Sequence, residues 1–365
     1  MKKIIFHLNC LAKGGAERVV TNLAHQFADN GYEVIIATEW VADVEYKLKS
    51  NVKRIHVGLT EKDEKKHRGI QYILRIEKLR ELIKKEKPDI VIAFMKKANY
   101  RATMAIIGIK IPIIFSVRMD PKQGYDSKMD RLFTKLFLER ADGCVFQTRQ
   151  QQKFFPKKIQ KKSKIILNPI NEKYIGRKIF SERSKQIVHV GRLVDFKNQI
   201  SIVKAFQMIE SDYPEHILKL YGEDSRDGTK ETLEEYIKSN NLENRIYLMG
   251  DSDDLESEIE GSCLFILNSN DEGMPNALME AMALGLPVIS TDCDCGGPAT
   301  LIRHMENGYL IPVKDTKKLE EAIRFMLDNP QKADEMGNEA RKIKNIASGA
   351  EVFNQWKRYV DELSK

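Results

Sequence analysis

The feature that most constrains the fold is an alternation of short apolar segments with helix-length amphipathic segments, which runs through the chain twice. In the first half this pattern predicts four strands and three helices. The strands are expected near 3–9, 33–38, 89–94 and 112–117, and the helices at 15–29, 70–86 and 98–107. Such alternation is typical of a parallel, doubly wound sheet, so the first half is expected to be Rossmann-like.

The same pattern restarts after Asn168-Pro169, where proline favours a domain boundary. The strands expected there are 187–190, 217–221, 245–248, 263–267 and 287–291, and the helices are 198–210, 229–239 and 275–284. A chain of 365 residues is long enough for two such domains, at 1–168 and 169–345. A final helix at 346–365 carries Phe353, Trp356 and Tyr359 at three-residue spacing, so that face should be buried.

Composition and charge indicate the cellular compartment of the protein and the kind of partner it meets. No apolar run approaches the ~18 residues that a membrane span requires, and the five cysteines lack the paired spacing of a zinc site. Both observations favour a cytoplasmic protein. Residues 1–168 hold 35 Lys and Arg against 18 Asp and Glu, a net charge of +17, and the remainder has a net charge of −10. This asymmetry suggests an anionic partner for the first half, and a merely solvated basic surface is the alternative.

The strongest motif places two carboxylates around the predicted helix 275–284, directly after an apolar strand. Pro275 suits the first position of a helix. The N–H groups and dipole of a helix N-terminus can bind a diphosphate, and Gly273 lets the backbone approach closely. Glu272 is placed to reach a sugar on that diphosphate, and Glu280 to accept hydrogen bonds from ribose hydroxyls. Either carboxylate alone would be unremarkable at a helix start.

Two further segments follow predicted strands. Arg192 and Lys197, in a loop that starts at Gly191, are placed to neutralise a leaving diphosphate; two ordinary surface cations are the alternative. Gly14-Gly15 lies in the turn between the first strand and the first helix, where backbone amides would face the same ligand. This turn lacks the full G-x-G-x-x-G pattern of dinucleotide sites.

Together these three segments resemble the retaining nucleotide-sugar glycosyltransferases of family 4, also called group 1, over essentially the whole chain. The resemblance rests on Glu272 and Glu280 eight residues apart, on Gly-Arg-Leu with a lysine five residues after the arginine, and on the glycine-rich first turn. It implies the GT-B fold: two facing Rossmann-like domains, an interdomain cleft that holds the site, and a C-terminal helix that crosses back to the N-terminal domain.

The resemblance also implies roles for individual residues. Glu272, Arg192 and Lys197 would be catalytic, Arg192 and Lys197 by holding the donor phosphates. The donor-binding residues would be Gly15, Gly191, Met249, Gly250, Gly273, Met274, Pro275, Asn276, Ala277, Leu278 and Glu280. Many members carry a histidine where this chain has Ser116 to Pro121, and Arg118 and Asp120 are expected to touch sugar or acceptor there. No cofactor or metal is expected, and Asp292-Cys293-Asp294 is interpreted as a loop.

The expected function is transfer of a hexose or N-acetylhexosamine, from a UDP-sugar in the first instance, to a glycan or polyprenyl-diphosphate-linked acceptor of bacterial surface polysaccharide assembly. The basic first half would meet the acceptor and an anionic membrane, with helix 70–86 as one contact, so peripheral attachment to the inner face of the membrane is expected. A non-catalytic nucleotide-sugar-binding paralogue and an epimerase-like protein are the alternatives. Nucleic acid is not expected, because no base-reading motif is present.

Overall fold

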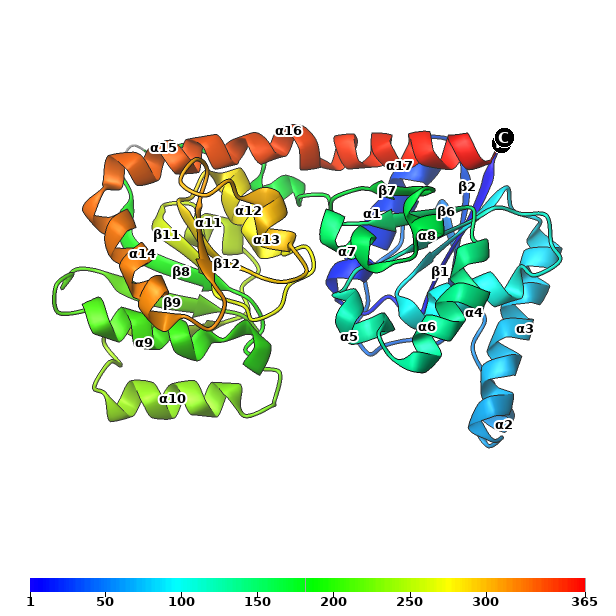
Figure 1. Cartoon of the computed structure of the whole chain (residues 1–365), viewed down its shortest axis with the longest axis horizontal. Coiled ribbons are helices and arrows are strands. Elements are labelled where there is room, and N and C mark those ends of the chain that lie inside the picture. Colours follow the sequence, from blue (N-terminus) through cyan, green and yellow to red (C-terminus); the bar gives the residue numbers. More distant parts are fainter. Residues whose placement is uncertain (181, 365) are drawn as a thin grey trace. The chain divides into compact units, whose positions relative to one another are not determined.

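The computed structural model describes residues 1–180 and 182–364. The chain divides into two compact units, Met1–Asn168 with Val352–Lys365, and Pro169–Glu351. Each unit contains one parallel sheet (Figure 1).

The first unit has a parallel sheet in the order β3-β2-β1-β4-β5-β6-β7. Its strands are β1 (Lys3–Leu8), β2 (Glu33–Thr38), β3 (Val52–His56), β4 (Ile90–Phe94), β5 (Ile113–Ser116), β6 (Gly143–Phe146) and β7 (Ser163–Ile165). Its helices are α1 (Gly15–Asp29), α2 (Glu61–Glu64), α3 (Arg68–Glu86), α4 (Lys96–Ala105), α5 (Pro121–Tyr125), α6 (Lys128–Leu136), η1 (Leu138–Arg140), α7 (Arg149–Phe154), α8 (Lys157–Gln160) and α17 (Gly349–Leu363). Strands β1, β4 and β6 are buried along nearly their whole length, as a sheet covered on both faces requires.

The second unit repeats this construction with strand order β10-β9-β8-β11-β12-β13. Its strands are β8 (Ser184–Val190), β9 (Ile217–Tyr221), β10 (Ile246–Gly250), β11 (Ser262–Leu267), β12 (Val288–Asp292) and β13 (Tyr309–Pro312). Its helices are η2 (Glu172–Tyr174), η3 (Asp195–Lys197), α9 (Gln199–Ile209), α10 (Thr229–Ser239), α11 (Leu255–Ile259), α12 (Asn276–Leu284), α13 (Gly297–Leu301), α14 (Thr316–Asp328), α15 (Pro330–Ala340), η4 (Arg341–Ile343) and α16 (Lys344–Ala347). Helices α9 and α14 pack on one another over its core (Figure 1).

Helix α17 packs on the first unit, as the family resemblance implies, and its aromatic face is buried, as the three-residue spacing predicts. Phe353, Trp356 and Tyr359 are all buried and belong to the same apolar cluster as α1 and the strands. The ring of Trp356 stacks on Phe94 at 5.6 Å. The hydroxyl of Tyr359 accepts a hydrogen bond from the backbone N–H of Cys144 at 3.0 Å. These contacts fix the last helix to the N-terminal sheet.

The tail differs from the sequence prediction in its continuity. The expected final helix, 346–365, is interrupted because Ser348 is extended, with φ −60° and ψ 154°, so α17 begins at Gly349. Residue 365 lies outside the described residues. No helix of the described residues combines the length and apolar character that crossing a bilayer requires.

Candidate functional site

The second sheet reverses its direction of growth between β8 and β11. From β8 the chain adds β9 and β10 on one side, and it then returns to add β11, β12 and β13 on the other. Strands β8 and β11 pair in parallel, with Leu264 opposite Ile187. In open α/β sheets the loops at the carboxyl ends of two such strands form a ligand-binding crevice. The two strongest sequence motifs follow these two strands.

The glutamate loop, residues 268–275 between β11 and α12, contacts the segment after β8 directly. The ammonium of Lys197 forms an ion pair with the Glu272 carboxylate, and the Ser269 hydroxyl donates to the same carboxylate oxygen at 3.1 Å. The side chains of Lys197 and Glu272 are only 15% and 11% exposed. The backbone N–H of Asn270 also donates to the carbonyl of Phe196 at 2.8 Å. Two residues predicted separately therefore form one charged pair.

The buried side chain of His189 and its hydrogen-bond partner Gln199 pack behind the loop from Gly191 to Lys197. The Nδ1 of His189 lies 2.9 Å from the carbonyl oxygen of Ile266, and the Gln199 amide lies 3.3 Å from its Nε2. Burial lowers the pKa of His189 to about 4, so the ring is neutral at pH 7. The Gln199 amide also donates to the backbone carbonyl of Arg192 at 2.8 Å. The side chain of Arg192 itself is exposed.

Helix α12 begins one residue later than the sequence predicts. Pro275 is the N-cap, with φ −77° and ψ 105°, and Asn276 is the first helical residue. Proline has no side-chain acceptor, so it does not cap the helix by itself. A Cβ on Gly297 would lie 1.8 Å from the carbonyl oxygen of Gly273, which shows that the turn before α13 presses against the glutamate loop. This role of Gly297 was not predicted from the sequence.

The remaining donor-site candidates lie on the same edge of the second sheet. Glu280 is on α12 and is 8% exposed. Met249 and Gly250 end β10, where Met249 is 39% exposed and the carbonyl of Gly250 accepts from the N–H of Gly222 at 2.7 Å. A Cβ on Gly222 would lie 2.1 Å from the carbonyl oxygen of Gly191, so this glycine lets the ends of β8 and β9 approach closely. Gly222 was not predicted.

Two candidates from the first unit, Gly15 and Arg118, follow strands of their own sheet. Gly15 is the exposed first residue of α1. The guanidinium of Arg118 lies over the rings of Phe94 and Trp356, at 5.0 and 5.7 Å, and donates to Asn168 at 2.8 Å. Burial lowers the pKa of Arg118 to about 9, so it remains charged at pH 7. These contacts give Arg118 a packing role, whereas contact with sugar or acceptor stays a prediction.

Asp120 also has a local role. Its carboxylate accepts a hydrogen bond from the backbone N–H of Lys122 at 2.9 Å and caps α5. It is 8% exposed. Contact of Asp120 with a sugar or acceptor likewise stays a prediction.

The Asp-x-Asp segment begins at Asp292, the last residue of β12, so the expected loop starts only at Cys293, and the segment does not form a cluster of metal ligands. Asp292 and Asp294 are exposed, while the Cys293 thiol is buried and donates to the carbonyl of Ser269 at 3.2 Å. Within residues 1–180 and 182–364, no group of three or more His, Cys, Asp or Glu side chains is arranged to hold a metal ion. The packing of Cys293 against Ser269 instead supports the glutamate loop from the β12 side.

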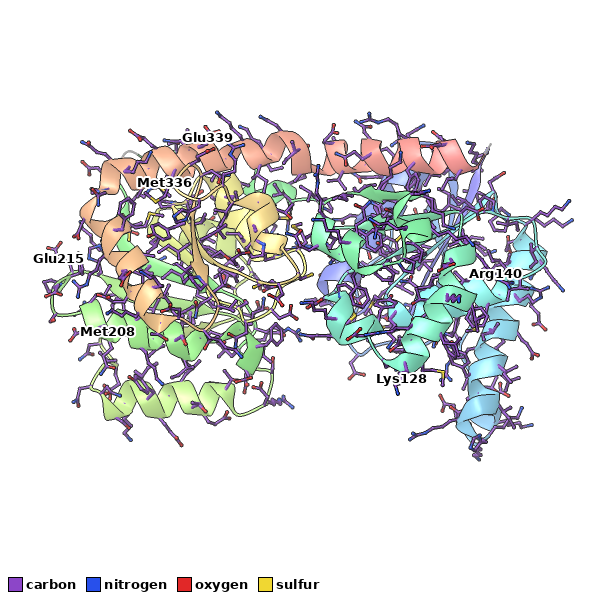
Figure 2. The ribbon with its side chains drawn as sticks, viewed as in Figure 1. Lys128, Arg140, Met208, Glu215, Met336 and Glu339 are labelled. Atoms are coloured by element: carbon purple, nitrogen blue, oxygen red, sulfur yellow. The ribbon has the colours of Figure 1, made fainter. Side chains whose placement is uncertain are left out.

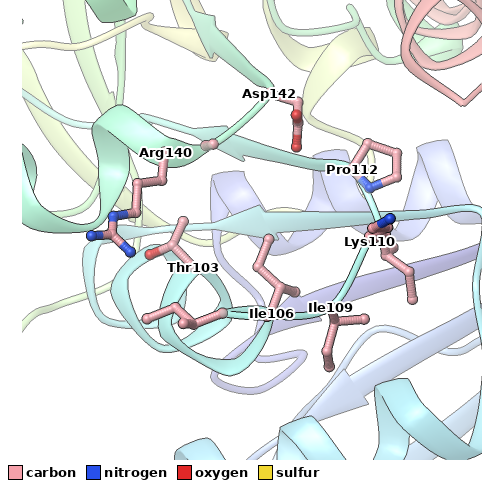
Figure 3. A pocket seen from close by; sticks show the side chains of 11 residues that line it. Thr103, Ile106, Ile109, Lys110, Pro112, Arg140 and Asp142 are labelled. Carbon is pink, nitrogen blue, oxygen red and sulfur yellow. The ribbon is translucent and has the colours of Figure 1, made fainter.

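A pocket of about 430 Å³ lies in the first unit beside the residues that precede β5 and β6, at the amino ends of these strands (Figure 3). It is lined by the connection between α4 and β5, including Ile106, Ile109 and Lys110, and by Arg140 and Asp142. The carboxylate of Asp142 accepts from the N–H of Ile113 at 2.9 Å. This carboxylate therefore has a structural partner, and the pocket carries no recognisable chemistry.

Two family models match adjoining parts of the chain. One, described as Glycosyltransferase Family 4, matches residues 13–174. The other, described as Glycosyl transferases group 1, matches residues 171–343. Together they span residues 13–343, which include the Gly14-Gly15 turn, the loop from Gly191 to Lys197 and the glutamate loop.

Individual proteins agree with these matches. An uncharacterised glycosyltransferase of Haemophilus influenzae is 24% identical over 98% of this chain and 99% of its own. The Campylobacter jejuni enzyme named GalNAc-alpha-(1->4)-GalNAc-alpha-(1->3)-diNAcBac-PP-undecaprenol alpha-1,4-N-acetyl-D-galactosaminyltransferase is 24% identical over 100% and 99%. The solved structure of Anabaena Alr3699/HepE with UDP superposes with a TM-score of 0.80 at 16% identity, over 99% of this chain and 100% of that one. The expected GT-B fold is thus confirmed, and the chain belongs to the family 4, or group 1, glycosyltransferases.

Proposed function

We propose that this glycosyltransferase moves a hexose or N-acetylhexosamine from a UDP-sugar to a glycan or polyprenyl-diphosphate-linked acceptor in bacterial surface polysaccharide assembly. Residues 169–345 would bind the donor, and residues 1–168 would bind the acceptor. The observation that carries the proposal is the Lys197–Glu272 pair at the switch point of the second sheet. A cation for the leaving phosphate and a carboxylate for the sugar stand side by side there.

The pair suggests how the donor binds. The diphosphate competes with Glu272 for the ammonium of Lys197, and Arg192 supplies a second cation from the same loop. Glu272 is then released to accept hydrogen bonds from hydroxyls of the sugar. The N-terminus of α12, residues Asn276 to Leu278, directs backbone N–H groups and the positive end of its dipole toward the phosphates.

The remaining donor contacts follow from the positions of the strand ends. Glu280 would accept hydrogen bonds from the ribose, and the backbone of Met249 and Gly250 would hold the base. Gly15 would approach the diphosphate from the first unit. This arrangement needs only the strand-end loops, which are where ligands of open α/β sheets bind.

Transfer would retain the configuration of the anomeric carbon. The bond from that carbon to the leaving phosphate oxygen breaks, and the acceptor hydroxyl forms a new bond on the same face. The proton of the hydroxyl passes to the leaving phosphate, so no carboxylate nucleophile is needed. Lys197 and Arg192 stabilise the negative charge that develops on the phosphate. An inverted product linkage, determined by NMR, would contradict this mechanism.

The identity of donor and acceptor draws support from relatives. The Campylobacter relative is named for a transfer of N-acetylgalactosamine onto an undecaprenyl-diphosphate glycan. HepE has also been solved with UDP-glucose. A net charge of +17 in residues 1–168 suits an anionic acceptor at a membrane, so the protein would work at the cytoplasmic face with peripheral attachment, to which helix 70–86 could contribute.

The test is incubation of the full chain with UDP-, GDP- and ADP-sugars, measuring thermal stabilisation and slow donor hydrolysis. One donor should stabilise the protein and be hydrolysed, and Lys197→Ala and Glu272→Ala should abolish the hydrolysis. A donor that binds without turnover would favour the non-catalytic paralogue, and a donor that is isomerised would favour the epimerase-like protein. Binding of none would overturn the site.

A further inference from the structure

Helix α6 of the first unit carries Met129, Leu132 and Leu136 on the outside, whereas its fourth apolar side chain, Phe133, packs against the ring of Tyr100 at 5.6 Å. Its inner face contacts α4: the hydroxyl of Tyr100 lies 3.2 Å from that of Thr134 and donates to the carbonyl of Asp130 at 3.1 Å. Thr134 is the one residue of α6 that is fully buried. At about 100° per residue, Leu132 lies almost directly opposite the midpoint of Asp130 and Thr134. Leu132 is 48% exposed.

Two more apolar residues extend the outward stripe. Met129 and Leu136 lie three residues before and four residues after Leu132, so all three share one side of the helix. Met129 is 59% exposed and Leu136 is 42% exposed. A surface helix of a globular protein ordinarily turns such a stripe toward the core. An apolar stripe that faces outward on a short helix therefore indicates an interaction surface.

Cations border this stripe. Lys128, Arg131 and Lys135 are exposed on α6, and Arg140 is exposed in η1, directly after it. Figure 2 shows Lys128 and Arg140 projecting from these elements. The acidic residue of α6, Asp130, is neutralised by Lys96 at 2.6 Å. The outer face of α6 thus combines apolar side chains with a positive charge.

Helix α3, which covers the predicted contact 70–86, differs in its cations. Arg75 pairs with Glu39 at 3.3 Å, and Lys78 pairs with Asp63 at 3.0 Å. Arg80 donates to backbone carbonyls of residues 105 and 107. Because these three cations already have partners inside the protein, they are less available to an external anionic surface. On α6, Arg131 pairs with Asp126 at 2.7 Å, but among residues 1–180 and 182–364 no ion pair is found for Lys128 or Lys135, so these two lysines remain available to an external partner.

We propose that α6 docks on an anionic lipid surface, with Met129, Leu132 and Leu136 inserted at the headgroup level and Lys128 and Lys135 among the lipid phosphates. This refines the proposed function and rests on it for the lipid-linked acceptor. An interfacial helix with an apolar face and flanking lysines binds anionic bilayers through both features. A second copy of the chain, docked through a two-fold axis, would instead bring like charges together.

The test is flotation of the full chain with vesicles of phosphatidylglycerol and phosphatidylethanolamine, and with phosphatidylcholine vesicles for comparison. Wild type should float with the anionic vesicles and much less with the neutral ones. The variant Leu132→Gln/Leu136→Gln should lower partitioning at least tenfold. The variant Lys128→Glu/Lys135→Glu should lower it by about thirtyfold or more, and the loss should shrink at high salt.

Two matched control variants test whether vesicle binding depends on α6 itself or arises from nonspecific adsorption of exposed apolar side chains. Met208→Gln removes an apolar side chain of α9 in the second unit that is 50% exposed (Figure 2). Ile70→Gln/Ile73→Gln removes the exposed apolar pair of α3, whose members are 49% and 54% exposed. Neither should lower partitioning more than about twofold. Unchanged flotation of both α6 variants would overturn the inference, and so would a loss confined to the α3 variant.

Three outcomes keep this inference distinct from the proposed function. Donor hydrolysis without vesicles should be unchanged in the α6 variants, which also shows that they fold. A wild-type protein that hydrolyses donor but does not float would overturn the docking surface and leave the transferase activity intact. A dimer in size-exclusion chromatography that Leu132→Gln/Leu136→Gln dissociates would also overturn it, in favour of a second copy.

Discussion

The ion pair between Lys197 and Glu272 predicts that stability and turnover respond differently when its members are removed. Truncating one partner of a fully buried pair costs about 3–5 kcal/mol, because the other charge stays buried without a partner. These two side chains are 15% and 11% exposed, so we expect Lys197→Met or Glu272→Gln to lower the free energy of unfolding by about 2 kcal/mol. The double variant leaves no charge unpaired and should cost less than the sum of the two.

Turnover should not show this compensation. If Lys197 stabilises the leaving phosphate and Glu272 binds the sugar, each single variant removes a separate interaction with the transition state. Loss of one such electrostatic contact typically lowers kcat by about 10²–10³-fold. The double variant should therefore be at least as inactive as the worse single variant, even though its stability partly recovers.

The assay combines urea unfolding with kinetics of donor hydrolysis. Both tryptophans, Trp40 and Trp356, belong to the first unit, so the urea midpoint measured by tryptophan fluorescence should stay unchanged. Far-UV circular dichroism reports the helices and strands of both units and should show the earlier unfolding of the second unit as a shifted part of the transition. The matched control is Lys318→Met/Glu321→Gln, an exposed pair on α14 at 2.6 Å, which should change neither stability nor turnover. If the Lys197 and Glu272 double variant regained turnover within about tenfold of wild type, the pair would be structural and the catalytic assignment would be refuted.

Four further predictions follow from individual contacts. Gly297→Ala should lower donor turnover at least tenfold, because its Cβ would meet the glutamate loop at 1.8 Å; Gly261→Ala, whose Cβ meets its nearest atom at 3.5 Å, should change turnover little. Glu280→Gln should raise the Kd for the nucleotide measured by calorimetry about tenfold, and an unchanged Kd would exclude ribose contact. Burial lowers the pKa of His189 to about 4 in the folded state, so the imidazole binds a proton more readily in the unfolded state. The free energy of unfolding of the second unit should therefore fall by about 3 kcal/mol as the pH falls from 6.5 to 4. In urea titrations, His189→Gln should make this free energy depend less on pH. Trp356→Ala should lower the free energy of unfolding by about 3–5 kcal/mol and speed hydrogen exchange of the amides of α17. Unchanged protection of these amides would contradict the role of Trp356 in holding that helix.

Long segments with clear periodicity were predicted well from the sequence. The expected helices at 15–29 and 229–239 and the strands at 33–38 and 217–221 have the bounds of α1, α10, β2 and β9. Each of the two helices buries an apolar stripe, with six buried residues in α1 and the pair Leu233 and Ile237 in α10, and each of the two strands pairs on both sides. Local pattern and tertiary burial agree at these elements.

Short edge elements were missed for the opposite reason. Strand β3, Val52–His56, lies at the edge of its sheet and carries Lys53 and Arg54 among its five residues. Strands β7 and β13, at the other edges, have three and four residues and are only partly buried. Helix α6 was missed as well, because Met129, Leu132 and Leu136 face outward and Phe133 alone does not define the register of a buried face. Edges and interaction surfaces relax the pattern on which sequence prediction depends.

The site shows most clearly which information the sequence lacks. Lys197 and Glu272 are 75 residues apart, and each was assigned a ligand contact without reference to the other. Their pairing depends on strand order, because β11 returns to the side of β8 that β9 leaves open. Had the chain placed β11 beyond β10, both motifs would be intact, but β9 and β10 would lie between them. The charged pair is thus a consequence of the reversal in the sheet, and the motifs acquire their joint chemistry only from that topology.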